Sequence, residues 1–249
     1  MTHVAVDRRQ FFGTFAAGAG AALTLAAAGP AAADNHGGGA AAACATMTPD
    51  LQKTITPDQA IEMLKEGNAR FVAGTTVNCD LMAQVKDTAG GQAPFAVVVG
   101  CIDSRVPPEL VFDQQIGDIF AARVAGNFVN TDIIGSLEFA TAVAGSKAIV
   151  ILAHSSCGAV KGAVDDVKLG NLTAMLENIQ PAIDQTPLTG EKSSKNTDYV
   201  EAVATKNAEL TVDNLLARSE VIKGLVDSGD VKIVAAKHDV ATGKVTFLS

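Results

Sequence analysis

Thiols, an imidazole and a carboxylate–guanidinium pair follow two apolar runs of the sequence. The run 96–100 is followed by Cys101-Ile102-Asp103-Ser104-Arg105, and the run 148–153 is followed by His154-Ser155-Ser156-Cys157. Thiolate and imidazole are ligands that suit Zn²⁺, and this ion is stable with four ligands. Cys101, His154 and Cys157 are therefore a candidate set of zinc ligands. Asp103 could supply the fourth ligand, or a water could take that position and make the site catalytic.

Each of these residues also has an ordinary structural explanation. A Cys after a buried strand is usually a small core residue, a lone His is usually hydrogen-bonded within the fold, and an Arg such as Arg105 usually faces solvent. The pairs Cys-x-Asp and His-x-x-Cys, each at the end of an apolar run, favour the metal site over these explanations. Redox catalysis by two thiols is less favoured, because the sequence contains no Cys-x-x-Cys.

The apolar runs indicate how these side chains meet. A Val-rich run without polar alternation is typical of a strand covered on both faces of a parallel sheet. Residues just after such strands lie at the carboxyl edge, where open α/β folds bind ligands. The predicted fold class is α/β, with a central, mostly parallel β-sheet, flanking helices and an antiparallel edge strand. We expect strands at 96–100, 148–153, 231–236 and 244–248, a strand and turn over 118–127, a helix that starts with a capping box at Thr56 and Gln59, and further helices over 131–144, 158–165, 172–182, 199–217 and 219–227.

The N-terminal part of the chain is predicted to be a targeting segment. Arg8-Arg9 precedes Phe11-Phe12, an apolar stretch covers 14–28, and Ala31-Ala32-Ala33 matches an A-x-A cleavage site. This pattern is similar to a twin-arginine export signal and predicts a periplasmic protein, with a transmembrane anchor as the alternative. The predicted organisation is an export signal over 1–33, a flexible Gly/Ala-rich linker over 34–50 and one domain over 51–249.

Charge and cysteine content limit the partners and the covalent framework. The formal charge of −8 over 249 residues argues against nucleic acid or an anionic membrane surface, because either would require a basic face. No membrane association is expected once the signal is removed. Four cysteines are too few for a disulfide framework in a domain of this size. Cys44 and Cys79 lie outside the two motifs, and they could form a bridge in the periplasm or remain free.

Four motifs resemble those of the β-class carbonic anhydrases: CIDSRVP at 101–107, GDIF at 117–120, AGN at 125–127 and HSSCGAV at 154–160. The resemblance runs from about Asn68 to the C-terminus and implies a β-carbonic anhydrase-like catalytic domain. The implied reaction is the reversible hydration of carbon dioxide to bicarbonate and a proton. The implied cofactor is one Zn²⁺ per chain, bound by the three residues proposed above.

The same resemblance assigns roles to residues around the metal. Asp103 and Arg105 correspond to a catalytic dyad: Asp103 paired with Arg105 leaves zinc to a water, whereas a released Asp103 ligates zinc and closes the site. Gln92, Phe120, Ala125 and Phe139 correspond to substrate-binding positions. The family builds this pocket partly from a second chain, which implies a homodimer or a homotetramer.

The sequence departs from the family pattern at a few positions. Val124 stands where Asn is common, Ala153 replaces the usual Gly before the zinc-binding His, and Phe139 stands where Tyr is frequent. His238 could shuttle protons, but a surface position is expected for it. Without a Trp in the chain, we expect no bicarbonate-inhibited allosteric subtype.

Two other functions compete with carbon dioxide hydration. A hydrolase on the same scaffold could act on a carbon dioxide analogue such as carbonyl sulfide or carbon disulfide, since access to the pocket alone could change the substrate. Alternatively, a protein with Asp103 permanently on the metal would bind zinc without catalysis.

Overall fold

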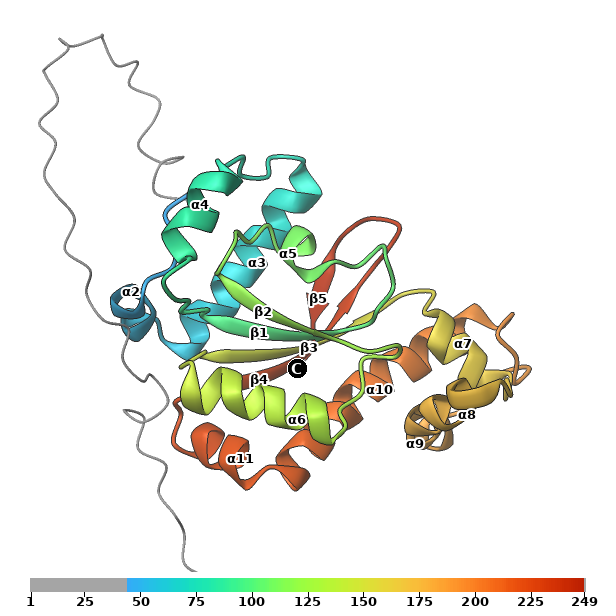
Figure 1. Cartoon of the computed structure of the whole chain (residues 1–249). Coiled ribbons are helices and arrows are strands. Elements are labelled where there is room, and N and C mark those ends of the chain that lie inside the picture. Colours follow the sequence, from blue (N-terminus) through green and yellow to red (C-terminus); the bar gives the residue numbers. More distant parts are fainter. Residues whose placement is uncertain (1–43, 249) are drawn as a thin grey trace, which may run out of the picture.

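The computed structural model describes residues 44–248. The predicted export signal and residues 34–43 of the predicted linker lie outside this range. Within it, five strands form one sheet in the order β2-β1-β3-β4-β5 (Figure 1). The first four strands are parallel and β5 pairs antiparallel with β4, which confirms the predicted fold class. The strands are β1 (Ala96–Gly100), β2 (Ile119–Arg123), β3 (Ala148–His154), β4 (Lys232–His238) and β5 (Val245–Phe247).

Helices cover both faces of the sheet, because the central strands are apolar on both sides. Val98 and Val150 pack into one core with Leu64 of α3, while Val99 and Ile151 belong to a second core that includes residues of α6, α10 and α11. Figure 1 accordingly shows α3 on one side of the strands and α6 and α11 on the other. The helices are α3 (Pro57–Ala73), α6 (Thr131–Glu138), α10 (Thr197–Arg218) and α11 (Glu220–Asp227).

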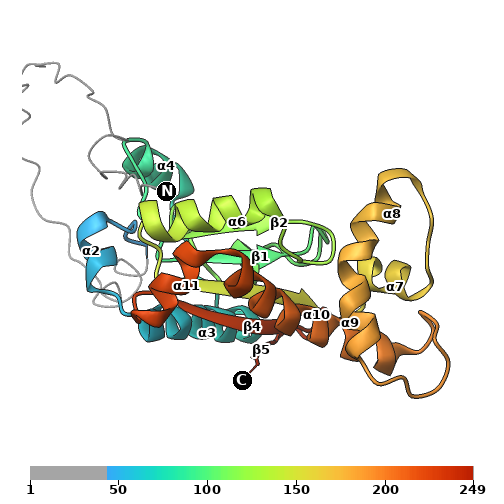
Figure 2. The ribbon, with the colours of Figure 1, turned by 90° about the horizontal axis from the view of Figure 1, so that it is seen from below.

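Three short helices form a lobe beyond the carboxyl ends of the strands (Figure 2). They are α7 (Gly158–Val164), α8 (Gly170–Leu176) and α9 (Gln180–Gln185). The single helix expected over 172–182 is wrong, because a 3₁₀ turn at Glu177–Ile179 separates α8 from α9. Pro181 explains the break, since it lacks the N–H that would continue an α-helix across this point. The lobe packs on α10 around a third core that contains Cys101 and Cys157.

The N-terminal helices follow local sequence signals. Helix α3 begins with the predicted capping box, in which the Thr56 side chain accepts a hydrogen bond from the Gln59 N–H and the Gln59 side chain accepts one from the Thr56 N–H. It ends at Gly74, whose φ of 68° is favourable for glycine. Three shorter helices complete this part of the fold: α2 (Pro49–Thr54), α4 (Leu81–Thr88) and α5 (Pro108–Val111). None of the described helices is both long and apolar enough to cross a membrane.

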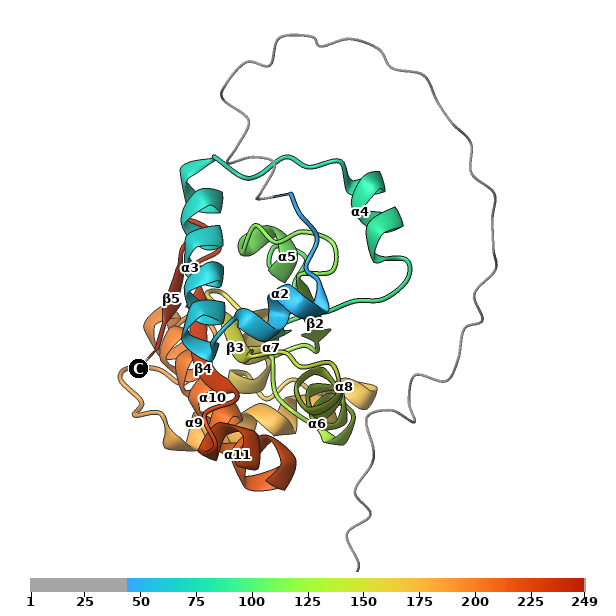
Figure 3. The same ribbon diagram turned by 90° about the vertical axis from the view of Figure 1, so that its left-hand side faces the viewer.

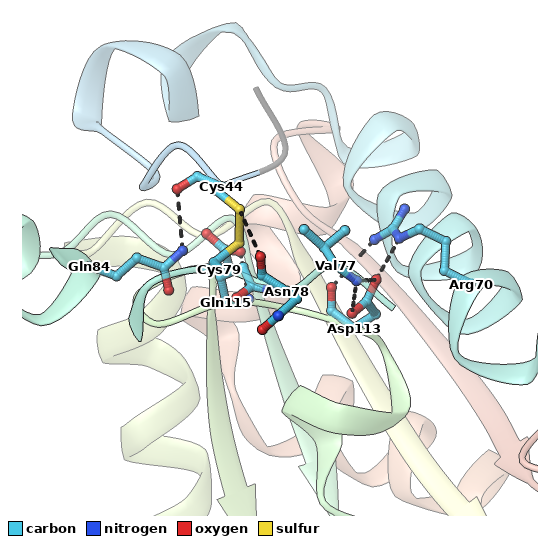
Figure 4. The surroundings of a disulfide bond; sticks show 9 residues. Cys44, Arg70, Val77, Asn78, Cys79, Gln84, Asp113 and Gln115 are labelled. Atoms are coloured by element: carbon cyan, nitrogen blue, oxygen red, sulfur yellow. Dashed lines mark hydrogen bonds and ion pairs between the residues drawn. A yellow bond between two sulfur atoms is a disulfide. The ribbon is translucent and has the colours of Figure 1, made fainter. Parts of the chain in front are cut away.

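A disulfide joins Cys44 to Cys79, the two cysteines for which the sequence left both states open. Figure 4 shows the bridge beside Gln84, whose Nε2 donates to the Cys44 carbonyl oxygen at 3.3 Å. Met47, three residues further along, is only 9% exposed and belongs to the core on the α3 side of the sheet. The chain therefore packs against the domain from residue 44 onward, within the stretch expected to be a linker.

Candidate metal centre

The three predicted ligands meet at the carboxyl edge of the sheet. Cys101 directly follows β1, His154 is the last residue of β3, and Cys157 immediately precedes α7. Because β1 and β3 are adjacent parallel strands with Gly100 opposite Leu152, both reach the edge at the same level. The ligand atoms of the three side chains all lie within 4.8 Å of one another. Each of the three residues is at most 4% exposed.

This donor set fits a zinc ion. Nε2 of His154 is buried and has no hydrogen-bond partner among the described residues, whereas Nδ1 lies 2.9 Å from the Ser155 carbonyl oxygen and so orients the ring. Cys101 and Cys157 are buried free thiols. A buried nitrogen without a hydrogen-bond partner is energetically unfavourable, and a metal ion bound to it would remove this cost. Two thiolates and one imidazole are a common protein donor set for zinc.

The two thiols influence each other's ionisation. A hydrogen bond from the Cys157 thiol, together with one from the Gly126 N–H, holds the pKa of Cys101 well below its ordinary value. The pKa of Cys157 is raised, because its proton bonds to Cys101, because it is buried, and because the charge on Cys101 opposes a second one. Both thiols can ionise together only when a cation lies between them.

Asp103 and Arg105 form a two-point ion pair at the rim of this centre. Arg105 Nε donates to Asp103 Oδ1 at 2.9 Å and Nη2 donates to Oδ2 at 2.7 Å, while the Arg105 N–H also reaches Oδ1 at 3.0 Å. These hydrogen bonds hold the pKa of Asp103 below its usual range. Oδ2 lies 3.9 Å from His154 Nε2, so the carboxylate lies beside the ligand set while Arg105 holds it.

Arg123, which the sequence analysis did not single out, fixes the backbone that carries this pair. It is the last residue of β2 and lies opposite Gly100 in the register. Its Nε donates to the Cys101 carbonyl oxygen at 2.8 Å and its Nη2 to the Asp103 carbonyl oxygen at 2.6 Å. A cation at the end of the strand next to the site was the only sign in the sequence, and it does not reveal the backbone partners.

The loop after β2 brings a backbone N–H to the thiolate position. Gly126 N–H donates to Cys101 Sγ, 3.4 Å away, and the Gly126 carbonyl oxygen accepts from Asn207 Nδ2 of α10 at 2.8 Å. Gly126 has a φ of 85°, and a Cβ there would lie 2.7 Å from Ile179 Cδ1. Only glycine therefore lets the loop approach Cys101 this closely.

A cavity of about 260 Å³ opens beside the ligands, between the loops after β1 and β2 and helices α7 and α8. Its lining includes Cys101, Ile102, Asp103 and Ala125. Of the four predicted substrate-binding residues, Ala125 is the one that lines this cavity. The lining is mainly apolar and suits a small, weakly polar molecule.

The other three predicted substrate-binding residues lie elsewhere in the same chain. Phe120 and Phe139 stack edge to face, with ring centroids 6.2 Å apart, in a separate hollow of about 650 Å³ along β2 and α6. Gln92 is exposed and precedes the amino end of β1, a strand that alone spans about 13 Å at ~3.3 Å per residue. One chain by itself does not bring these three residues to the ligands.

His238 is buried, so the surface position expected for it is wrong. It is 3% exposed and lies opposite His154 in the β3–β4 register. Neither ring nitrogen has a hydrogen-bond partner among the described residues, and burial lowers the pKa of the imidazole. The residue lies inside because β4 extends as far as β3 and β5 covers its outer edge.

Two thiols, an imidazole and a carboxylate paired with Arg105 lie together at the carboxyl edge of an α/β sheet and form a candidate metal site of the kind found in zinc enzymes. A family model described as carbonic anhydrase matches residues 96–245. Carbonic anhydrase 2 of Mycobacterium tuberculosis is 34% identical over 197 residues, which cover 77% of this chain and 92% of that protein. A carbonic anhydrase of Mycolicibacterium smegmatis is 35% identical over 199 residues, which cover 78% of this chain and 94% of that protein.

Solved structures give the same assignment. A tetrameric β-carbonic anhydrase from Sordaria macrospora matches with a TM-score of 0.58 and 28% identity, over 66% of this chain and 85% of that one. The Coccomyxa β-carbonic anhydrase in complex with acetazolamide matches with a TM-score of 0.60 and 26% identity, over 67% of this chain and 77% of that one. The chain belongs to the β-carbonic anhydrase family, as its motifs predicted.

Proposed function

We propose that the protein binds one zinc ion per chain through Cys101, His154 and Cys157 and hydrates carbon dioxide reversibly to bicarbonate and a proton. The observation that carries this proposal is the burial of three convergent ligand atoms beside a carboxylate that Arg105 holds by two hydrogen bonds. Zinc in such a site lowers the pKa of a bound water to about 7, which supplies a nucleophile at neutral pH.

The protein's own residues orient the reactants. Asp103 stays ionised because of Arg105, and its remaining lone pairs can accept a hydrogen bond from a group at the open position. Ile102 and Ala125 give the adjacent cavity apolar walls, which admit carbon dioxide without competing for hydrogen bonds. As long as Arg105 holds Asp103, the fourth position is left to water and substrate.

The test uses the purified, zinc-loaded chain. Elemental analysis should give one zinc per chain, and stopped-flow measurements should detect carbon dioxide hydration from neutral to alkaline pH. Parallel assays with carbonyl sulfide and carbon disulfide should give much lower turnover. Faster turnover of either gas than of carbon dioxide would assign the chain to the analogue hydrolases. Bound zinc without activity at any of these pH values would make it a zinc-binding protein.

We propose that a second copy of the chain completes the pocket, in a homodimer or homotetramer. The support is the exposed hollow around Phe120 and Phe139, which is separate from the metal centre of its own chain, and the tetrameric state of the Sordaria relative. Light scattering should give at least twice the monomer mass. Phe120→Asp should shift the mass to that of a monomer and lower activity, whereas Leu169→Asp, at an exposed position of the lobe, should leave both unchanged.

We propose that the mature protein acts in the periplasm after twin-arginine export. The Cys44–Cys79 disulfide supports an oxidising location, because disulfides persist there and are rare in the cytosol of most bacteria. Cell fractionation should recover the protein in the periplasm, and replacement of Arg8 and Arg9 by Lys should retain it in the cytoplasm. Recovery of the unaltered protein in the cytoplasm would refute this location.

A further inference from the structure

The turn between His154 and Cys157 is held by charged side chains on both sides. Ser156, in the middle of the turn, has a φ of 54°, a conformation that residues other than glycine rarely adopt. Its N–H donates to Glu201 Oε1 at 2.7 Å, and its carbonyl oxygen accepts from Arg105 Nη2 at 3.3 Å. The surroundings must determine such a conformation, and here they link Glu201 of α10 to the Asp103–Arg105 pair.

Glu201 is itself fixed by β4. Lys237 Nζ lies 2.6 Å from Glu201 Oε2 and also donates to the Glu201 carbonyl oxygen at 3.3 Å. The side chains of Lys237 and Glu201 are 22% and 29% exposed, so the pair is partly shielded from water. The neighbouring Ser155 is tied to the end of β4, because its N–H donates to the His238 carbonyl oxygen at 2.8 Å and its Oγ accepts from the Val240 N–H at 2.9 Å. Helix α10 and strand β4 thus hold the turn together.

Arg105 needs an anchor outside its own loop. Asp103 and Arg105 are two residues apart, so the bonds between their side chains fix them to each other but not to the rest of the centre. The Arg105 side chain is 50% exposed. Among the hydrogen bonds of its guanidinium within the described residues, the one to the Ser156 carbonyl oxygen is the bond that reaches another element. The position of Ser156 therefore sets where the ion pair lies relative to the ligands.

We propose that Glu201 is a positioning residue for carbon dioxide hydration: it holds the Ser156 turn so that the Ser156 carbonyl anchors Arg105, which keeps the Asp103 carboxylate away from the metal. Lys237 supports this role by fixing the second oxygen of Glu201. The inference rests on the proposed zinc-dependent function. The inference adds that Glu201 controls the fourth coordination position from a distance. Its side chain acts through the backbone of the Ser156 turn and contacts neither metal nor substrate.

Four variants of the zinc-loaded enzyme test the role of the Glu201 carboxylate. Glu201→Ala removes the acceptor of the Ser156 N–H, and Glu201→Asp keeps the charge but is one methylene too short to reach it. Both should retain full zinc and lose about 10- to 100-fold in kcat, a loss typical of groups that orient a metal site. Glu201→Gln keeps an acceptor oxygen for the Ser156 N–H but loses the oxygen that pairs with Lys237, which keeps only its bond to the Glu201 carbonyl oxygen. It should stay within about threefold of wild type, less than 1 kcal/mol of barrier, because the bond to Ser156 is the one that positions the turn. Glu209→Ala is the matched control, since Glu209 lies on the same helix and pairs with Lys206.

A spectroscopic measurement separates positioning from general support. In cobalt-substituted protein, azide should change the visible spectrum of the wild type and of Glu201→Gln, because the fourth position is open to it. In Glu201→Ala and Glu201→Asp the response should be lost or need at least about tenfold more azide, because Asp103 occupies that position. A crystal structure of zinc-loaded Glu201→Ala should place the Asp103 carboxylate on the metal.

Wild-type activity and azide response in both Glu201→Ala and Glu201→Asp would overturn the inference. Equal losses in Glu201→Gln and Glu201→Ala would also overturn it, because the retained acceptor would then be irrelevant. Should Glu201→Ala fail to fold, Glu201→Asp alone decides, as it keeps the pair with Lys237. Absence of carbon dioxide hydration in the wild type would refute the proposed function, whereas the azide response would still test the position of Asp103.

Discussion

The two ends of the central sheet differ in the hydrogen bonding of their buried polar groups. At the amino end, Gln52 of α2 donates through Nε2 to the carbonyl oxygens of Pro94 and Ala144, at 2.7 and 2.9 Å, and Ser146 Oγ donates to the same Pro94 oxygen at 2.8 Å. Figure 3, viewed from this end, shows α2 in front of the strands. At the carboxyl end, side-chain nitrogens of Asn127, His154 and His238 are buried without partners among the described residues.

This difference separates polar residues that stabilise the fold from polar residues that lie near the proposed metal site. A buried polar group without a hydrogen bond costs about 1 to 3 kcal/mol, so the bonds of Gln52 and Ser146 stabilise the fold, whereas the unpaired nitrogens at the carboxyl end do not. Two residues at the carboxyl end, Asn127 and Ser156, also have positive φ values. The unpaired His154 Nε2 belongs to the proposed metal site, where a bound ion would supply the missing interaction.

The largest effect is expected from removing a ligand at the carboxyl end. Cys101→Ser, His154→Ala or Cys157→Ser should each lose most of the bound zinc, because each removes one of the three ligands of the proposed set. Elemental analysis measures the loss directly. The double variant Cys44→Ser/Cys79→Ser is the control and should keep its zinc. Full zinc occupancy in any of the three ligand variants would show that the ligand set is wrong.

The Asp103–Arg105 pair should affect activity without affecting zinc content. In Arg105→Ala, an anionic carboxylate near the metal loses its competing cation, and Coulomb attraction draws it onto the zinc. Activity should fall about 100-fold or more. Arg105→Lys should rescue poorly, since an ammonium cannot form the two-point contact.

The control for this prediction is Arg70→Ala, which breaks the Arg70–Asp113 pair between α3 and the turn after α5. It should retain wild-type activity per folded molecule. A metal-replete Arg105→Ala enzyme within about threefold of wild type, less than 1 kcal/mol of barrier, would exclude the dyad mechanism.

In the N-terminal region, by contrast, changes should alter stability and not catalysis. Reduction of the Cys44–Cys79 disulfide, or its replacement by serines, opens a loop with a sequence separation of 35 residues. The unfolded chain gains freedom, and the free energy of unfolding should fall by about 2 to 4 kcal/mol. Urea titration with and without reductant measures this change. At temperatures where both forms are folded, kcat should be the same with and without the disulfide. A lower kcat without it would contradict the separation of the two regions.

A smaller loss of stability is expected at the amino end itself. Gln52→Leu keeps the apolar volume but removes both donors, and the free energy of unfolding should fall by about 1 to 3 kcal/mol because the Ala144 carbonyl oxygen loses its bond from Gln52. Thermal unfolding measures the effect. Gln59→Leu, which removes a capping contact of α3 near the surface, should cost less, and an equal or greater loss there would contradict the importance of the buried contacts.

Much of the site was predictable because its signals are local. Thr56 and Gln59 lie within one helical turn, so the capping box could be found from residue types alone. The ligands follow two apolar runs, and the rule that parallel strands end at one edge brings them together without further information. These predictions needed residue type, spacing and one general property of parallel sheets.

The rest depends on contacts between distant parts of the chain. Glu201 bonds to a backbone N–H 45 residues away and Arg123 to carbonyl oxygens 20 and 22 residues away, and backbone partners leave no mark in the residue types. The burial of His238 depends on how far β4 extends beside β3. Phe120 and Phe139 were assigned by resemblance, and one chain alone does not bring them to the ligands.

The disulfide also changes the connectivity of the molecule. Cys44 and Cys79 close a covalent ring that contains both α2 and α3, and the exposed residues Thr75 and Thr76 lie inside that ring. A single protease cut at these threonines would divide the chain without releasing a fragment. The nicked protein would migrate as one species on a denaturing gel until thiol is added, and as two afterwards. The N-terminal helices are therefore attached to the enzyme by two covalent routes.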